Sequence, residues 1–184
     1  MPGLQAERGT AITIGWSRAS ARHVGIAVII ALIGVAVDLG TKLAVLAWLD
    51  PARPIPLLGG LVTLRLTRNP GAAFSMGESF TLVFTCFAIL ALIAISGWLL
   101  PKVRHTGWAV TTGLLLAGIT GNLIDRLFRE PGPFRGEVID FIQLPYFAIF
   151  NVADICITSA AVLVIWLSVV RQVSPAGISL RKDA

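Results

Sequence analysis

The sequence predicts an all-α membrane protein with four transmembrane helices and a small extracytoplasmic β element in the first long loop. Of the 184 residues, 55% are hydrophobic and only 14% are charged, whereas soluble domains contain about 25% charged residues. The mean hydropathy is +0.82. Four apolar stretches are each long enough to cross a hydrocarbon core of ~30 Å, which takes about 20 helical residues.

These apolar stretches occupy residues 24–48, 80–100, 107–128 and 147–170. The first is not expected to be a cleavable signal peptide, because it is too long and carries Asp38 and Lys42. We expect the whole chain, 1–184, to form a single integral membrane domain.

The two long loops, 49–79 and 129–146, differ in their predicted structure. The first contains an alternating run at 61–67 that predicts a short strand, and a turn signal follows it at Asn69-Pro70-Gly71. The second begins with a segment rich in Pro and Gly, residues 129–136, which is expected to be irregular.

The distribution of basic residues predicts the orientation. Four spans place both termini on one side of the membrane and both long loops on the other. The tails and the short link hold eight Lys or Arg residues, and the long-loop side holds six. This count favours cytoplasmic termini. The net charge is +5, and the Lys and Arg residues that produce it lie mainly between the apolar runs. This placement favours contact with membrane lipid and argues against nucleic-acid binding.

Polar residues within the spans gather toward the long-loop end of the bundle. A charged side chain at mid-bilayer costs about 2.5–3.5 kcal/mol, so each needs an explanation. A rise of ~1.5 Å per residue places all of them toward that end. They are Asp38, Lys42, Asn122, Asp125, Asn151 and Asp154. Asn69 and Asp140 lie in the loops that cap the same end, so the sequence predicts a functional site there.

One spacing occurs twice within this set. Asn122 and Asp125 are three residues apart, as are Asn151 and Asp154. On a helix, residues i and i+3 share a face, so each pair is expected to place an amide beside a carboxylate. Asp125 is followed by Arg126, which could neutralise it.

Asp140 and Asp154 have no Lys or Arg within several residues. Two carboxylates that lie close together without a cation do not both ionise, so one holds a proton while the other stays charged. Such a pair can activate water against an amide carbonyl and protonate the leaving amine, which is aspartic-protease chemistry. Asp125 is a reserve candidate for this pair.

Several other interpretations remain open. Asp38 and Lys42 are four residues apart and could form a structural ion pair. Lys42 could instead serve a Ser–Lys hydrolase with Ser75 or Ser79. The main rival from another class is a small ion-coupled transporter, which would need polar groups through the whole membrane depth. No metal is expected, because the sequence lacks His-rich ligand spacing.

Five motifs resemble those of one known family, bacterial lipoprotein signal peptidase, also called signal peptidase II. In order they are Asp38-Leu-Gly-Thr-Lys42, Arg68-Asn-Pro-Gly-Ala-Ala-Phe74, Gly121-Asn-Leu-Ile-Asp-Arg126, Glu137-Val-Ile-Asp-Phe141 and Phe150-Asn-Val-Ala-Asp154. The resemblance implies an endopeptidase of the bacterial inner membrane that removes signal peptides from diacylglyceryl-modified prolipoproteins. It would cut just before the lipidated cysteine, near the outer leaflet.

The resemblance also implies roles for individual residues. Asp140 and Asp154 match the catalytic pair. The matches to substrate-lining or supporting positions are Asn69, Asn122, Arg126 and Asn151, and those to other polar positions near the site are Asp38, Lys42 and Asp125. No metal or organic cofactor is expected, and we expect a monomer whose partners are the lipidated prolipoprotein and membrane lipid.

Overall fold

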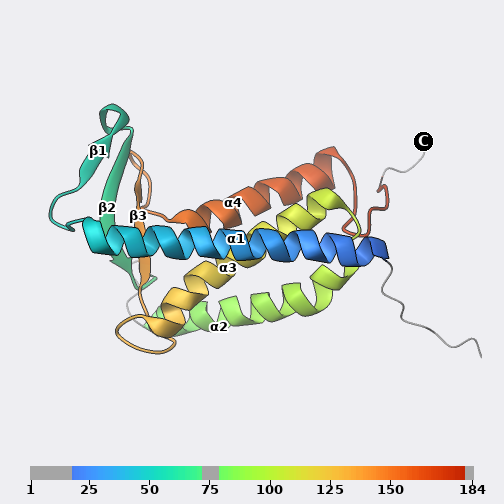
Figure 1. The fold of residues 1–184 in the computed structure, drawn as a ribbon, viewed down its shortest axis with the longest axis horizontal. Coiled ribbons are helices and arrows are strands. Elements are labelled where there is room, and N and C mark those ends of the chain that lie inside the picture. The colour runs from blue at the N-terminus through green and yellow to red at the C-terminus, as the bar shows by residue number, and fades with distance from the viewer. Residues whose placement is uncertain (1–17, 72–78, 181–184) are drawn as a thin grey trace, which may run out of the picture.

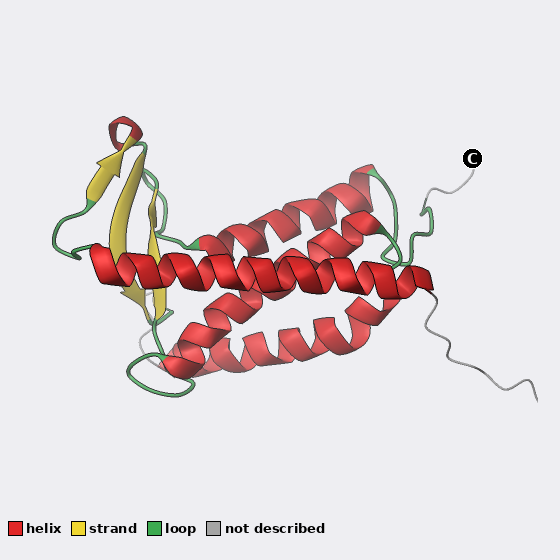
Figure 2. Cartoon of the chain, in the orientation of Figure 1, coloured by secondary structure: helices red, strands yellow, loops and turns green. Residues whose placement is uncertain are grey.

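The structure is a computed structural model that describes residues 18–71 and 79–180, a bundle of four helices with a three-stranded sheet across one end (Figure 1). The helices are α1 (Arg18–Trp48), α2 (Ser79–Ala94), α3 (Thr106–Phe128) and α4 (Val152–Ile165), and the strands are β1 (Ile55–Leu57), β2 (Val62–Asn69) and β3 (Val138–Gln143). Figure 2 shows the strands gathered at one end only. The predicted fold class is confirmed.

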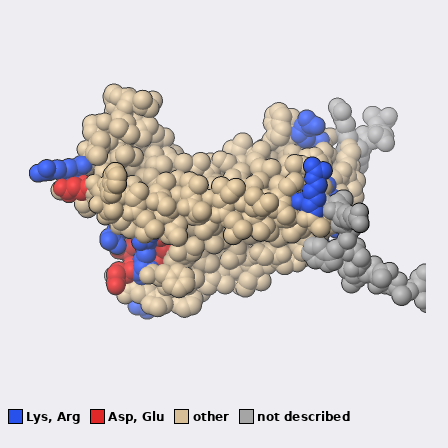
Figure 3. All heavy atoms as spheres, in the orientation of Figure 1, with Lys and Arg blue, Asp and Glu red and all other residues tan. Residues whose placement is uncertain are grey.

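Within residues 18–71 and 79–180, four helical segments are long and apolar enough to cross a membrane, and they contain between 19 and 29 residues. On the face shown in Figure 3, charged side chains lie at the two ends of the bundle and leave a broad band between them without charge. This distribution suits a bundle whose middle lies in hydrocarbon and whose ends lie in the polar interfaces.

Helix α3 lies at the centre of the bundle. Of its most apolar stretch, 56% is buried within the protein, against 6% to 22% for the other three spans. Small residues allow this close packing. A methyl group at Gly118 would lie 2.4 Å from the carbonyl oxygen of Ala153 on α4, and one at Gly121 would lie 2.5 Å from Asp38 Oδ2 on α1. Helices in membranes approach closely where such residues meet.

The sheet joins the two long loops. Its strand order is β1-β2-β3, and both pairs are antiparallel. The predicted strand at 61–67 corresponds to β2. The partner strand β3 was not expected, and it pairs Asn69 with Val138 and Thr67 with Asp140. Each loop thereby gains a partner for its backbone polar groups, which an isolated two-stranded hairpin would only partly provide.

The fourth helix begins later than the sequence suggested. We expected a span from residue 147, whereas α4 begins at Val152. The reason is that Phe150 belongs to the sheet region: its backbone nitrogen donates to the Ile142 carbonyl at 2.9 Å, and its carbonyl accepts from the Phe141 and Ile142 nitrogens at 3.0 and 2.9 Å. These bonds turn the chain before the helix starts.

The close packing of α3 against α4 can be tested at Gly118. We expect Gly118→Ala to lower stability by about 1–3 kcal/mol, because the added methyl group overlaps the α4 backbone. The matched control is Gly40→Ala on α1, where no other group lies within 4 Å of the added methyl. It should be neutral or slightly stabilising. Thermal unfolding in detergent measures both variants, and equal melting temperatures would contradict this account of the packing.

Candidate active site

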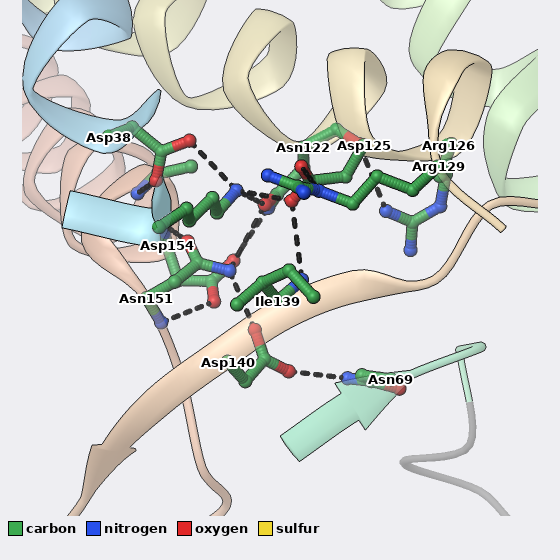
Figure 4. A network of polar contacts seen from close by, with 12 residues as sticks. Asp38, Asn69, Asn122, Asp125, Arg126, Arg129, Ile139, Asp140, Asn151 and Asp154 are labelled. Atoms are coloured by element: carbon green, nitrogen blue, oxygen red, sulfur yellow. Dashed lines mark hydrogen bonds and ion pairs between the residues drawn. The ribbon is translucent and has the colours of Figure 1, made fainter. Parts of the chain in front are cut away.

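Polar side chains from five elements meet where the sheet crosses the bundle (Figure 4). All nine residues selected from the sequence lie in this region. Helix α1 contributes Asp38 and Lys42, β2 contributes Asn69, α3 contributes Asn122, Asp125 and Arg126, β3 contributes Asp140, and the start of α4 contributes Asn151 and Asp154. The structure thus brings together groups that are more than 100 positions apart in the chain.

Asp140 lies in the middle of β3 and is 2% exposed. Its Oδ2 accepts a hydrogen bond from Asn69 Nδ2 at 2.8 Å, and its Oδ1 accepts one from Asn151 Nδ2 at 2.6 Å. Burial raises the pKa of Asp140 from 3.8 to about 6, and the neighbouring Asp154 adds to the rise, while the two amide hydrogen bonds lower it. This carboxyl group is therefore suited to exchange a proton near neutral pH.

Asp154 occupies the first turn of α4. Its Oδ1 accepts from Asn122 Nδ2 at 2.8 Å, and its Oδ2 accepts from the Asn151 backbone nitrogen at 3.1 Å. The Asn151 side-chain oxygen in turn accepts from the Asp154 backbone nitrogen at 3.0 Å. The two residues thus form a reciprocal capping box at the helix N-terminus.

This cap corrects one expectation. We expected Asn151 to share a helix face with Asp154, as Asn122 does with Asp125. Instead, Asn151 is the N-cap and has an extended backbone, with φ −133° and ψ −176°. The three-residue spacing arises because a capping side chain reaches the third residue of its helix.

Asn151 connects the two carboxyl groups. Its side-chain amide donates to Asp140 Oδ1, and its backbone nitrogen donates to Asp154 Oδ2. The same amide group also lies 3.1 Å from Asn122 Oδ1. One residue therefore fixes both carboxylates, one on a strand and one on a helix, relative to each other.

Lys42 is fully buried and contacts three oxygens. Its Nζ lies 2.8 Å from Asp38 Oδ2, 2.8 Å from Asp125 Oδ2 and 3.1 Å from Asn122 Oδ1. An ammonium group only donates hydrogen bonds, so the oxygen of the Asn122 amide must face it. The nitrogen of that amide then points to Asp154.

Asp125 has partners other than the one expected. The sequence suggested Arg126 as its counter-ion, whereas the structure pairs it with Lys42 and with Arg129. On a helix, residue i+4 lies on the same face and residue i+1 does not, which explains the difference. The spacing of Asp125 and Arg129 is the signal that the sequence analysis missed. Asp125 Oδ2 also accepts from the Ile139 backbone nitrogen at 3.2 Å, so this carboxylate ties α3 to α1 and β3.

The carboxylate of Asp38, like that of Asp125, connects different elements of the fold. Besides Lys42, it accepts a hydrogen bond from the Ala153 backbone nitrogen at 2.9 Å. It therefore links α1 to the first turn of α4. The ion pair of Asp38 and Lys42 that their spacing suggested is confirmed.

Two cavities reach the polar cluster. One, of about 300 Å³, borders Asp154 and follows α4 past Ile155 to Ser159. The other, of about 410 Å³, lies between α2 and α3, and Asn122 and Arg126 form part of its wall. Both are mainly apolar, so the polar groups are accessible from surfaces that could hold an apolar ligand.

The geometry of the site gives less support to a Ser–Lys hydrolase or to a metal site. Lys42 contacts two carboxylates, which is the arrangement of an ion pair and leaves no lone pair for a general base. Ser75, one of its suggested partners, lies outside the described residues. Among the residues that the structure describes, no group of three or more His, Cys, Asp or Glu side chains is arranged to hold a metal ion.

Comparison with known proteins gives a consistent result. A family model described as signal peptidase II matches residues 30–170. A lipoprotein signal peptidase of Streptomyces coelicolor is 41% identical over 162 residues, which cover 88% of this chain and 78% of that protein. One from Mycobacterium avium is 42% identical over 134 residues, or 73% of each chain.

A solved structure is also similar. It is a bacterial membrane enzyme structure determined by the in meso method at 2.3 Å resolution. It has a TM-score of 0.70 at 28% identity and matches 80% of this chain and 89% of that one.

The buried cation at the centre of the site can be tested by its removal. We expect Lys42→Met to destabilise the protein by about 3–5 kcal/mol, because Asp38 then remains buried without its counter-ion and Asp125 keeps only Arg129. The matched control is Lys102→Met, which removes an exposed lysine stacked on Trp98 and should cost less than about 1 kcal/mol. Thermal unfolding in detergent is the measurement. Equal losses in the two variants would show that the buried ion pairs do not stabilise the fold.

Proposed function

This chain belongs to the signal peptidase II family of membrane peptidases, and we propose that it is an aspartic endopeptidase that removes signal peptides from bacterial prolipoproteins. Its substrate is a prolipoprotein whose cysteine carries a diacylglyceryl group, and the bond cut is the one just before that cysteine. The observation that carries the proposal is the coupling of Asp140 and Asp154 through Asn151.

The proposed reaction uses the two carboxyl groups in opposite protonation states. A buried carboxyl group with a pKa of about 6 makes Asp140 the holder of the proton. Asp154, as the ionised partner, takes a proton from a water molecule as the water oxygen attacks the scissile carbonyl. Asp140 protonates the carbonyl oxygen at the same time. When the tetrahedral intermediate collapses, Asp154 passes its proton to the leaving amine and Asp140 recovers its own.

The surrounding amides keep the two carboxyl groups in place. Asn122 and Asn151 each donate a hydrogen bond to one of them. In this proposal, Asn69 and Arg126 hold the extended peptide around the scissile bond. Asn69 is at the end of β2, and Arg126 is in the wall of the cavity between α2 and α3. The remaining polar residues, Asp38, Lys42 and Asp125, form the frame that supports Asn122.

We propose that the protein is a monomeric, single-domain component of the bacterial inner membrane. Its termini lie in the cytoplasm and its active site near the outer leaflet, as the excess of basic residues in the tails and the short link indicates. The enzyme contacts membrane lipid and needs no metal or organic cofactor.

An ion-coupled transporter is the rival function from another class, and it requires polar groups along the whole membrane depth. The described residues instead place the polar cluster at the sheet end. The opposite end contains an apolar core formed by Ala27, Val103, Trp108, Ala109 and Leu167. This asymmetry favours a peptidase with access from one side.

Removing either carboxylate tests the proposed dyad. We expect Asp140→Asn and Asp154→Asn each to lower cleavage of a diacylglyceryl prolipoprotein by ~10³-fold or more, because each removes one half of the acid–base pair. Asp50→Asn is the matched control, since Asp50 is exposed and its carboxylate contacts the exposed Arg53 and accepts a hydrogen bond from the Ala52 backbone nitrogen. A gel-shift assay measures cleavage, and circular dichroism shows that the variants fold. Full activity in either dyad variant would exclude that residue from catalysis.

The raised pKa of Asp140 predicts a pH dependence. Because the proton of Asp140 is needed for catalysis, kcat/KM should fall as pH rises above about 6. The hydrogen bond from Asn69 stabilises the ionised form and lowers the pKa of Asp140. Asn69→Ala should therefore move the alkaline limb of the profile to higher pH, whatever it does to the maximum rate. A limb that moves to lower pH in this variant would contradict the assignment of the proton to Asp140.

A further inference from the structure

The cavity between α2 and α3 is a long apolar groove. One wall extends from Phe84 of α2 to Ile95, the residue just after α2. The α3 wall includes Leu115 and Ile119, and Ile157 of α4 closes part of the side. Apolar side chains form nearly all of its lining, and the volume is about 410 Å³. The groove therefore suits an apolar ligand that enters from the membrane.

The length of the groove matches one leaflet of the membrane. Phe84 and Ile95 are 11 positions apart, which is ~16 Å along a helix. Half of a hydrocarbon core is ~15 Å. A helical peptide does not fit, because a cylinder ~10 Å wide and ~16 Å long has a volume of roughly 1,300 Å³. An extended hydrocarbon chain has the appropriate width.

One end of the groove is polar and belongs to the active site. Asn122 lines the groove and also donates to Asp154, so the groove begins beside the proposed catalytic pair. Arg126 lies at the same end. Its Nη1 makes a long contact of 3.5 Å with the Asn122 carbonyl, and its buried Nε has no hydrogen-bond partner within the described part of the chain. The guanidinium group thus has donors to offer to a carbonyl oxygen at the entrance.

We propose that the groove between α2 and α3 binds one acyl chain of the diacylglyceryl group on the substrate cysteine. This inference rests on the proposed function and specifies how its substrate is recognised. The lipidated cysteine directly follows the bond that is cut, so its glyceride starts next to the dyad. One ester carbonyl lies near Arg126, and the attached chain follows the groove toward Ile95.

The second cavity is less suited to this role. Its α4 wall extends from Asp154 to Ser159, which is five positions, or ~8 Å of helix, and the rest of its wall is formed by Leu144, Phe147 and Phe150 at the sheet end. This is about half the depth of a leaflet. A full acyl chain would extend beyond it, whereas the groove between α2 and α3 accommodates one along its length.

The test fills the groove without changing the catalytic groups. Ala91 lines the groove, while Ala94, three residues later on α2, is exposed on the outer surface and does not. The variants Ala91→Leu and Ala94→Leu therefore add the same atoms to the same helix, and only the first adds them inside the groove. Ala88→Leu, also in the groove, replaces Ala91→Leu if that variant does not fold.

Two synthetic substrates separate chain binding from the rest of recognition. They are the same prolipoprotein peptide with a dipalmitoyl or a dihexanoyl glyceryl group on its cysteine. For the dipalmitoyl substrate, Ala91→Leu should raise KM about tenfold and leave kcat unchanged, because two methylene groups displaced from the groove account for about that factor. KM for the dihexanoyl substrate should change less than about twofold, since its chains end near the entrance. Ala94→Leu should change neither.

A binding measurement separates this inference from the proposed function. The inactive Asp140→Asn protein and the double variant that also carries Ala91→Leu are each titrated with the fluorescent dipalmitoyl peptide. Weaker binding by the double variant supports the acyl site even if the wild type cleaves neither substrate. Absence of wild-type cleavage would overturn the proposed function alone. Equal effects of Ala91→Leu on both substrates, or equal effects of Ala91→Leu and Ala94→Leu, would overturn the acyl site and leave ordinary membrane lipid as the occupant of the groove.

Discussion

The arrangement of the site depends on the buried ammonium group of Lys42. It lies between Asp38 and Asp125, which are themselves hydrogen-bonded to the backbones of α4 and β3. In a low-dielectric interior, carboxylates that lose their hydration need a cation, and without Lys42 the Asp38 carboxylate would have none while Asp125 would keep only Arg129. With the cation, they connect α1, α3, α4 and the sheet at one point. Figure 4 shows this cluster directly beside the two carboxyl groups of the proposed dyad.

The same cation also determines how the dyad is hydrogen-bonded. The carbonyl oxygen of Asn122 faces Lys42, so its amide nitrogen faces Asp154. The orientation of Asn151 has an independent cause, because its carbonyl oxygen caps α4 and its nitrogen then faces Asp140. Each carboxyl group thus receives an amide donor whose orientation is fixed before substrate binds. Such preorganisation spares the enzyme the reorganisation of dipoles during the reaction.

Local patterns in the sequence predicted the parts of the structure that depend on local physics. The apolar stretches predicted the four helices, and the four-residue spacing of Asp38 and Lys42 predicted their ion pair. The depth of the polar residues correctly predicted a shared end of the bundle. Strand β3 was missed because its pairing with β2 joins residues about 70 positions apart, which leaves no periodic signal. The cap at Asn151 was misinterpreted because a helix face and a capping box have the same spacing.

The division of roles between α2 and α3 explains why a groove exists beside the site. Glycines let α3 contact the neighbouring backbones of α1 and α4 closely, at Gly113 and Gly118. On the side that faces α2, α3 lines the groove with Leu115 and Ile119. The α2 side of the groove includes large side chains such as Phe84 and Phe87. The span that contains α2, Thr81–Lys102, stands apart from the rest of the bundle, since only 6% of its most apolar stretch is buried within the protein. In a membrane, that separation exposes no apolar surface to water, so it costs little. A loosely packed α2 therefore leaves an apolar groove beside the proposed catalytic pair, while the tight packing of α3 keeps the polar groups of the site in position.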